Sequence, residues 1–258
     1  MAAFRDHFSG HAEDYARWRP SYPEELYAWL ATLTATGRVW DCATGNGQAA
    51  VALARRFERV VATDASLDQL ARTEARGAGS GSKGPRGRVS YLCAEATRSG
   101  LAAGSVDLVT VAQALHWFDL EPFHAEVRRV VRPGGAIAAW TYDLLRVGPE
   151  IDRAVSRFHD VTVGEDWPDE RRHVDGRYAE IELDFEPIAP PPFRMRREWD
   201  LPQLLAYVGT WSAVRRFESR SGRDPLPELA AALEPVWGPP ERRREVRWHL
   251  TVLAGRVE

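Results

Sequence analysis

The sequence has few cysteines, methionines and lysines. Its 258 residues include two cysteines, Cys42 and Cys93, two methionines and a single lysine, Lys83. Two cysteines cannot form a disulfide framework. Both end stretches that predict buried strands, where a free thiol packs as a small hydrophobic group. A fold stapled by several disulfides is therefore excluded.

Long apolar runs and an excess of basic charge are also missing. No stretch is apolar enough to cross a bilayer, and the opening MAAFRDHFSG lacks the apolar core of a signal peptide. The net charge is -3 and the pI about 6.2, so no overall basic field attracts nucleic acid or anionic lipid. We expect a cytoplasmic enzyme without a membrane or nucleic-acid partner.

Hydrophobic periodicity predicts strands that alternate with helices. Residues 1–38 read as a helical arm, because apolar residues recur at helical spacing in YPEELYAWLATL, 22–33. Strands are expected at 38–42, 59–63, 89–93, 107–112 and 136–142, and helices at 48–57, 66–75 and 122–131. A flexible loop is expected at 77–87 and a turn at 132–135. This alternation is typical of βαβ units and of a parallel sheet with helices on both faces.

The pattern changes after residue 142. Residues 143–192 are charged and aromatic and end in Ala-Pro-Pro-Pro, which favours a cap or insertion. Strands are expected at 193–199 and 245–254 as an antiparallel edge, with helices at 201–207 and 227–233. We therefore expect an arm at 1–38, a Rossmann-like α/β core at 39–142, and a region at 143–258 that supplies a substrate cap and edge strands of the same domain.

A glycine-containing stretch, Asp41-Cys-Ala-Thr-Gly-Asn-Gly47, lies between a predicted strand and a predicted helix. Gly45 and Gly47 let the backbone turn tightly and approach a ligand, and the next helix offers unpaired N–H groups at its N-terminus. Asp64, at the end of the second strand, is placed to accept hydrogen bonds from two ribose hydroxyls. These features predict a nucleoside-binding crevice.

The stretch alone does not decide which nucleoside binds. Gly45-Asn-Gly-Gln-Ala-Ala50 fits the G-x-G-x-x-A pattern of dinucleotide sites, with Asp64 at a suitable distance. Asp41 argues against a dinucleotide, because its carboxylate would repel a pyrophosphate and would suit a cationic amino group. An NAD(P)-dependent oxidoreductase and a protein that binds its cofactor without catalysis remain as alternatives.

Six segments carry a resemblance to a known family. They are YARWRPSYP (15–23), VWDCATGNG (39–47), ATD (62–64), Ala94-Glu95, VTVAQALHWF (109–118) and RPGG (132–135). In this order they resemble the class I S-adenosylmethionine-dependent methyltransferases, and most of all the small-molecule branch that includes trans-aconitate methyltransferase-like proteins. The resemblance implies S-adenosylmethionine as cofactor, S-adenosylhomocysteine as product, and a small-molecule acceptor methylated at a carboxylate or hydroxyl oxygen.

The resemblance also implies a cofactor site built from the arm and from the ends of four strands. The expected cofactor-binding residues are Tyr15, Arg19, Asp41, Ala43, Gly45, Gly47, Asp64, Ala65, Ala94, Glu95 and Gln113. Asp41 and the turn after it would hold the methionine moiety, Asp64 the ribose, and the residues around Ala94 the adenine. The family usually has glycine where this chain has Ala43.

Other residues are candidates for the acceptor side. His116 follows the fourth strand, in the loop that faces the methyl group in the family, and would serve as a base for a hydroxyl, thiol or amine acceptor. Its alternative is a loop histidine bonded to the backbone. Tyr22 and Trp117 are expected to line the substrate pocket, and Arg19 suits a carboxylate through its planar guanidinium. A carboxylate needs no base, because it is already ionised at pH 7.

No metal site is expected. His7 and His11 have the i, i+4 spacing that can present two imidazoles to one metal, but no third ligand is evident. The pair Arg171-Arg172 could form an anion site, but a run of charges is usually a solvated face, and we expect the latter. An RNA methyltransferase is disfavoured by the net charge. The sequence specifies neither the acceptor nor the oligomeric state.

Overall fold

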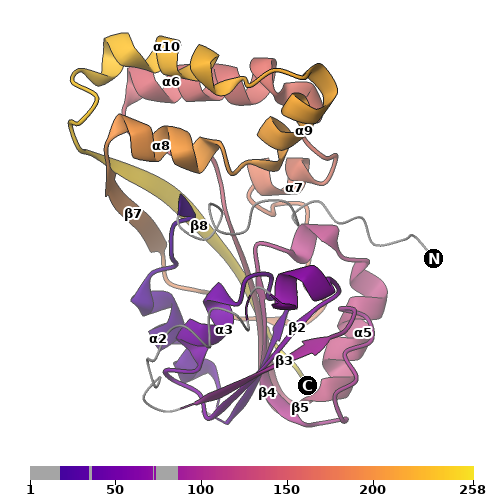
Figure 1. Cartoon of the computed structure of the whole chain (residues 1–258). Coiled ribbons are helices and arrows are strands. Elements are labelled where there is room, and N and C mark those ends of the chain that lie inside the picture. The colour runs from indigo at the N-terminus through magenta and orange to yellow at the C-terminus, as the bar shows by residue number, and fades with distance from the viewer. Residues whose placement is uncertain (1–17, 35–36, 72, 74–86) are drawn as a thin grey trace.

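The computed structural model describes residues 18–34, 37–71, 73 and 87–258. They form an eight-stranded sheet with a layer of helices beyond one of its ends (Figure 1). The strands are β1 (Arg38–Cys42), β2 (Arg59–Asp64), β3 (Arg88–Cys93), β4 (Val106–Ala112), β5 (Val131–Tyr142), β6 (Glu186–Pro187), β7 (Phe193–Trp199) and β8 (Arg244–Arg256). The α-helices are α2 (Glu24–Leu33), α3 (Gln48–Leu53), α5 (Leu120–Val130), α6 (Pro149–Arg157), α7 (Arg171–Asp175), α8 (Leu201–Val208), α9 (Ser212–Ser221) and α10 (Leu226–Trp237).

The sheet is mostly parallel. Its strand order is β3-β2-β1-β4-β5-β8-β6, with β7 paired to β8 beside this path. Strands β1 to β5 are mutually parallel, and β8 runs antiparallel to β5. The chain order reverses at β1, which lies between β2 and β4, and ligands of open α/β sheets bind at the carboxyl ends beside such a reversal. The Rossmann-like fold predicted from the sequence is confirmed.

Both faces of the sheet are covered because side chains alternate along each strand. Val39 of β1 and Leu108 of β4 pack in the cluster that holds α2 and α3. Trp40, one residue on, faces the opposite cluster, where α5 contributes Phe123 and Val127. A strand buried on both faces reads as a continuous apolar run, which is why β1 and β4 are conspicuous in the sequence.

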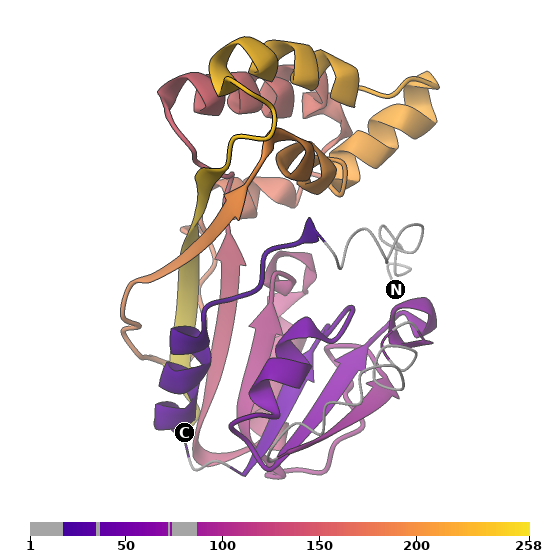
Figure 2. The ribbon, with the colours of Figure 1, turned by 60° about the vertical axis from the view of Figure 1, so that its left-hand side comes forward.

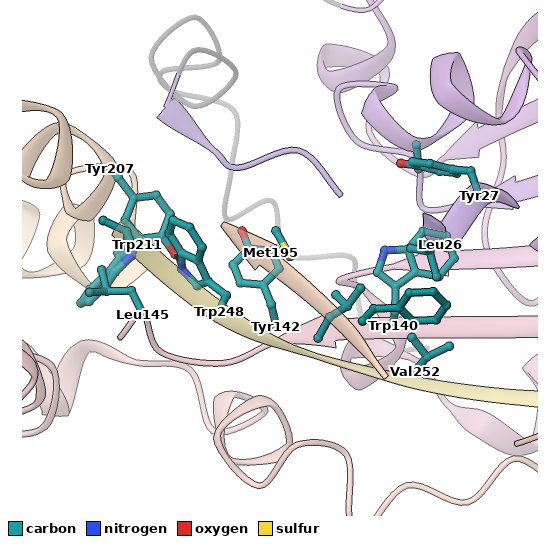
Figure 3. Packing of buried hydrophobic residues seen from close by; sticks show 14 of the residues in the cluster. Leu26, Tyr27, Trp140, Tyr142, Leu145, Met195, Tyr207, Trp211, Trp248 and Val252 are labelled. Atoms are coloured by element: carbon teal, nitrogen blue, oxygen red, sulfur yellow. Dashed lines mark hydrogen bonds between the residues drawn. The ribbon is translucent and has the colours of Figure 1, made fainter. Parts of the chain in front are cut away.

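Helices α6 to α10 form a cap beyond the carboxyl ends of the parallel strands (Figure 2). Strands β7 and β8 reach from the sheet to this cap (Figure 2). The hydrophobic core continues with them, from Trp140 of β5 to Trp248 of β8 and on to Tyr207 and Trp211 (Figure 3). The Trp248 indole N–H donates to the Tyr207 hydroxyl at 3.2 Å. The cap therefore shares the core of the sheet.

Several expected elements differ in extent. Helix α3 ends at Leu53, four residues early, and α9 is not expected from the sequence. The Arg-Pro-Gly-Gly turn lies within β5, where the pairing with β4 shifts register and Gly134 takes a φ of 77°. Such an irregularity lets a strand continue through a glycine that would otherwise end it. Strand β8 lies inside the sheet rather than at its edge, since it pairs with β5, β6 and β7.

The prediction for Cys93 is wrong. Cys42 is buried as expected, but Cys93 is exposed. It ends β3, which lies at the edge of the sheet and has no neighbour beyond it among the described residues. An edge strand lacks the second layer of packing that would bury its side chains, and periodicity alone does not reveal which strand lies at the edge.

Neither a membrane span nor a metal cluster is found in the part of the chain that the structure describes. No helix there is long and apolar enough to cross a membrane. No group of three or more His, Cys, Asp or Glu side chains is placed there to bind a metal ion. His7 and His11 lie outside the described residues.

Candidate cofactor and acceptor site

The predicted site residues follow the carboxyl ends of neighbouring strands. Asp41 and the glycine turn follow β1, Asp64 ends β2, Ala94 follows β3 and Gln113 follows β4. Because these strands are parallel and adjacent, their ends lie at one edge of the sheet, beneath the cap (Figure 2). Tyr15 lies outside the described residues.

The turn after β1 uses three left-handed residues. Ala43, Gly45 and Gly47 have φ values of 53°, 55° and 75°. Gly47 is tightly packed, because an added Cβ would lie 2.5 Å from a Thr73 methyl carbon, whereas at Gly45 nothing lies within 4 Å. The turn therefore leaves open space at Gly45. At the first position of the turn, Ala43 is strained, since a left-handed conformation is unfavourable for a residue with a Cβ.

Asp41 is fully buried and its carboxylate is held by two hydroxyls. Thr44 donates to Oδ2 at 2.6 Å, and Thr110 of β4 donates to Oδ1 at 2.7 Å. Burial raises the pKa of this carboxyl to about 6, and the two hydroxyl hydrogen bonds partly oppose the rise. Asp41 has no exposed surface. In this conformation it holds the turn against β4.

Asp64 joins the turn to the next loop. Its Oδ2 accepts from the Gly45 N–H at 2.8 Å and its Oδ1 from the Ser66 N–H at 2.9 Å. A small part of its surface, 8%, remains exposed.

The loop after β3 lies next to Asp64. The Ala94 N–H donates to the Asp64 carbonyl at 3.1 Å, and the Cys93 thiol lies 3.7 Å from the Ala65 carbonyl. Ala65 and Ala94 are half-buried and Glu95 is exposed. The residues expected at the adenine therefore lie together, with the Cys93 thiol among them.

Gln113 uses its side chain inside the protein. Its Oε1 accepts from the Thr141 hydroxyl at 2.8 Å and from the Tyr142 N–H at 2.9 Å, and its Nε2 donates to the Tyr142 carbonyl at 3.3 Å. Gln113 also has a left-handed φ of 57°. It fixes the end of β4 to the end of β5.

Arg19 links the arm, the sheet and the cap. Its Nη1 donates to the Tyr142 hydroxyl at 2.8 Å, and its Nη2 lies 3.4 Å from the Thr210 carbonyl. The guanidinium also lies over the ring of Tyr207, 5.8 Å from its centroid. Tyr22 packs edge-on against Trp140 with ring centroids 5.6 Å apart, and it lines an outer groove between α2, α3 and β7.

His116 lies in a short helical turn after β4. Its Nδ1 is 2.9 Å from the hydroxyl of Tyr178, a buried cap residue, and its ring lies 5.0 Å from that of Trp117. Burial lowers the pKa of His116 to about 3, with added contributions from the charges of Arg171 and His173. The imidazole is therefore neutral at physiological pH.

Arg171 is not the solvated surface residue that the sequence favours. Only 18% of its side chain is exposed, whereas Arg172 beside it is exposed as expected. Arg171 lies over the Trp167 ring, 4.4 Å from the centroid, and its Nε donates to Asp175 at 2.8 Å. Its charge acts on both His116 and Tyr142. The i, i+4 spacing to Asp175 is the signal that could have indicated an ordered side chain.

Comparison with known proteins identifies this arrangement. A family model described as a methyltransferase domain matches residues 40–139. A protein of Dictyostelium discoideum named as a methyltransferase is 30% identical over 235 residues, covering 89% of this chain and 86% of that protein. A solved structure from Anaeromyxobacter dehalogenans, described as a type II methyltransferase, is 42% identical with a TM-score of 0.82, covering 93% of this chain and 98% of its own. The chain belongs to the class I S-adenosylmethionine-dependent methyltransferases.

A methyltransferase structure from Bacillus halodurans C-125 shares the fold at 19% identity and a TM-score of 0.50, over 90% of this chain and 97% of its own. S-adenosylmethionine is the cofactor of the 258-residue chain. The residues present fit it: an open glycine turn for the methionine part, the partly exposed Asp64 carboxylate at the end of β2 for the ribose, and a half-buried loop for the adenine.

Ala43→Gly should stabilise the methyltransferase. The left-handed backbone conformation destabilises an alanine by about 1 kcal/mol. Removing the Cβ relieves this strain, and the stability gained exceeds the stability lost because glycine gives the unfolded chain more conformational entropy. We expect the free energy of unfolding, measured with urea, to rise by up to about 1 kcal/mol. The matched control is Ala50→Gly in α3, which should lower it by about 1 kcal/mol or more. Equal destabilisation by both changes would contradict the strain at Ala43.

The buried Asp41 carboxyl should make stability depend on pH. Its folded pKa of about 6 exceeds the usual value of 3.8, so the native state binds the extra proton between these values. Stability from this group therefore falls as the pH rises from about 4 to 6, by about 3 kcal/mol at most.

Asp41→Asn removes this titration. The difference in unfolding free energy between wild type and Asp41→Asn should move against the wild type as the pH rises over that interval. Asp68→Asn, an exposed change four residues after the end of β2, serves as the control and should show a flat difference. A flat difference for Asp41→Asn as well would show that Asp41 titrates normally.

Proposed function

We propose that this methyltransferase transfers a methyl group to an oxygen of a small-molecule acceptor that carries a carboxylate. The cofactor would lie against the turn after β1, Asp64 and the loop after β3. The acceptor would lie beneath the cap, at the ends of β4 and β5, among Arg19, His116, Trp117 and Arg171. When bound, the cofactor supplies a methyl group on a positively charged sulfur, which makes it a strong methyl donor.

The observation that carries this proposal is the pair of arginines at the end of β5. Arg19 reaches Tyr142 from the arm, and the charge of Arg171 acts on the same tyrosine from the cap. The Nε of Arg171 donates to Asp175. The two Nη groups of Arg171 have no hydrogen-bond partner among the residues described. They form the fork that binds a carboxylate with two parallel hydrogen bonds.

The low pKa of the His116 imidazole supports an acceptor that is already ionised. An imidazole with a pKa of about 3 takes up a proton poorly at neutral pH, so it would be a weak general base. A hydroxyl acceptor would need such a base, whereas a carboxylate is an anion at pH 7. The protein then has to orient the acceptor in line with the methyl group and to exclude water.

Cofactor binding should be measurable without knowing the acceptor. Titration calorimetry should show saturable binding of S-adenosylmethionine and S-adenosylhomocysteine. Asp64→Asn should weaken both at least about tenfold, since it removes a charged acceptor of hydrogen bonds worth about 1.5 kcal/mol or more. The exposed change Asp68→Asn should leave binding unchanged. Binding of NAD(P)H alone would contradict the assigned site.

The cysteines provide a second readout of the same site. Cys93 is exposed beside the proposed adenine position, while Cys42 is buried and burial raises the pKa of its thiol. Labelling by a thiol reagent should therefore report Cys93, and S-adenosylhomocysteine should slow it. Unchanged labelling at saturating S-adenosylhomocysteine would place the adenine elsewhere.

Arg171→Gln should impair the acceptor rather than the cofactor. Methyl transfer from labelled S-adenosylmethionine would be screened over mono-, di- and tricarboxylates and the corresponding alcohols and phenols. For a carboxylate acceptor, KM should rise about ten- to a hundredfold on loss of one charged hydrogen-bonding group, with cofactor affinity unchanged.

Arg172→Gln is the matched control, because this neighbour on α7 is exposed. It should leave both KM and cofactor affinity unchanged. Turnover confined to uncharged acceptors, or equal effects of Arg171→Gln and Arg172→Gln, would rule out the carboxylate-binding role.

A further inference from the structure

A strained segment of the cap reaches the loop that carries His116. Arg177 and Tyr178, directly after α7, both have left-handed backbones, with φ values of 55° and 58°. Non-glycine residues keep this conformation only where their surroundings hold them, and such strain gathers at functional sites. Two strained residues in succession therefore indicate that this segment holds a side chain in a particular place.

Each residue of the pair is anchored to a different strand end. The Arg177 guanidinium donates from both Nε and Nη2 to Asp143, next to the end of β5, with each distance 2.8 Å. Tyr178 donates its backbone N–H to the His173 carbonyl at 2.7 Å. Its side chain is 1% exposed and ends 2.9 Å from Nδ1 of His116. The strained pair thus holds one phenol against one imidazole.

We propose that Tyr178 is a positioning residue, whose hydroxyl donates to Nδ1 of His116 and fixes the imidazole in the tautomer that carries its proton on Nε2. His116 then presents an N–H donor on the other side of its ring, toward the acceptor oxygen. In this arrangement His116 is a neutral hydrogen-bond donor and not a base.

The direction of the hydrogen bond follows from the neighbouring protons. Thr141 donates its hydroxyl proton to Gln113 Oε1, whose orientation is fixed because it also accepts the Tyr142 N–H. Thr141 therefore has no proton to offer Tyr178.

Tyr178 itself remains protonated, because burial raises the pKa of its phenol. Among the described residues, the phenol oxygen has one hydrogen-bond partner, Nδ1 of His116 at 2.9 Å, and the lone pair of a neutral imidazole nitrogen is a better acceptor than a phenol oxygen. The phenol proton is left for Nδ1 of His116. The imidazole is neutral and has a single proton, which must then lie on Nε2.

A donor at this position suits the acceptor proposed above. An N–H and the guanidinium of Arg171 can both donate to a carboxylate, whereas an unprotonated nitrogen would repel its lone pairs. The consequence for the acceptor rests on the proposed function. The tautomer does not, because it is a property of the free protein.

Nitrogen NMR of the full chain labelled with ¹⁵N-histidine tests the tautomer directly. Proton–nitrogen couplings within the ring distinguish a proton on Nε2 from one on Nδ1, and His116→Gln assigns the signal. We expect wild-type His116 to be neutral at pH 7, with its proton on Nε2. A proton on Nδ1, or a charged imidazole, would overturn the proposal whatever the fate of any variant.

Tyr178→Phe supplies the comparison. Losing a donor to Nδ1 removes a hydrogen bond that favours the neutral form, so the pKa of His116 should rise and the Nδ1 resonance should shift toward that of an unbonded nitrogen. Tyr27→Phe, at another buried tyrosine on α2, should change neither. A pKa that falls or stays constant in Tyr178→Phe would show that the hydrogen bond runs the other way.

The kinetic readout separates this proposal from the proposed function. With a carboxylate acceptor in hand, Tyr178→Phe should raise its KM while the affinity for S-adenosylmethionine stays constant. If the tautomer is as expected but no carboxylate is methylated, the proposed acceptor class fails and the positioning role stands. If carboxylates are methylated and KM does not change in Tyr178→Phe, the role of His116 toward the acceptor fails.

Discussion

A carboxylate sealed inside the sheet is the interaction on which the cofactor site depends. Asp41 has no contact with solvent, and both of its oxygens are held by hydroxyls. An isolated buried charge is very costly, so these partners are obligatory. Thr110 joins β1 to β4, and Thr44 joins the turn to β1. Since Gly45 in that turn donates to Asp64, the same chain of contacts extends to the end of β2. Three strand ends are thus fixed relative to one another by one buried charge.

At the proposed acceptor position, the arm, the sheet and the cap are connected through the hydroxyl of Tyr142. Arg19 donates to it from the arm and also reaches Thr210 of the cap. Burial raises the pKa of the Tyr142 phenol to about 12, with Arg19 opposing the rise, so the phenol stays neutral and accepts from the guanidinium. The arm is therefore held by polar contacts at this end, while Tyr22 holds it by ring packing against Trp140. Parts of the chain far apart in sequence therefore meet at the end of β5.

The sequence was informative where function or burial constrains each residue locally. Strands β1 and β7 have the predicted bounds, because buried runs and strict alternation are visible in a single stretch. The turn with Gly45 and Gly47 and the acid at Asp64 were also visible, since backbone geometry restricts which residues fit there. The exposure of Cys93 was not, because it depends on the absence of a neighbouring strand. Nor was the burial of Arg171, which depends on Trp167 and on cap helices that local periodicity does not place.

The electrostatics of the acceptor side favour one kind of chemistry at the expense of another. Arg171 brings a positive charge close to His116. A cation nearby disfavours a second cation, so the charge that attracts an anionic acceptor also keeps the imidazole from taking up a proton. Binding an ionised acceptor and supplying a general base are therefore opposing demands on this site. Burial is the main cause of the low pKa of His116 and Arg171 adds to it, so the site disfavours the base that a hydroxyl acceptor would need, whereas a carboxylate would use the positive charge as it stands. Under the proposed function, the preference for an ionised acceptor therefore depends on Arg171 together with the burial of His116, and changing Arg171 should leave the turn after β1 untouched.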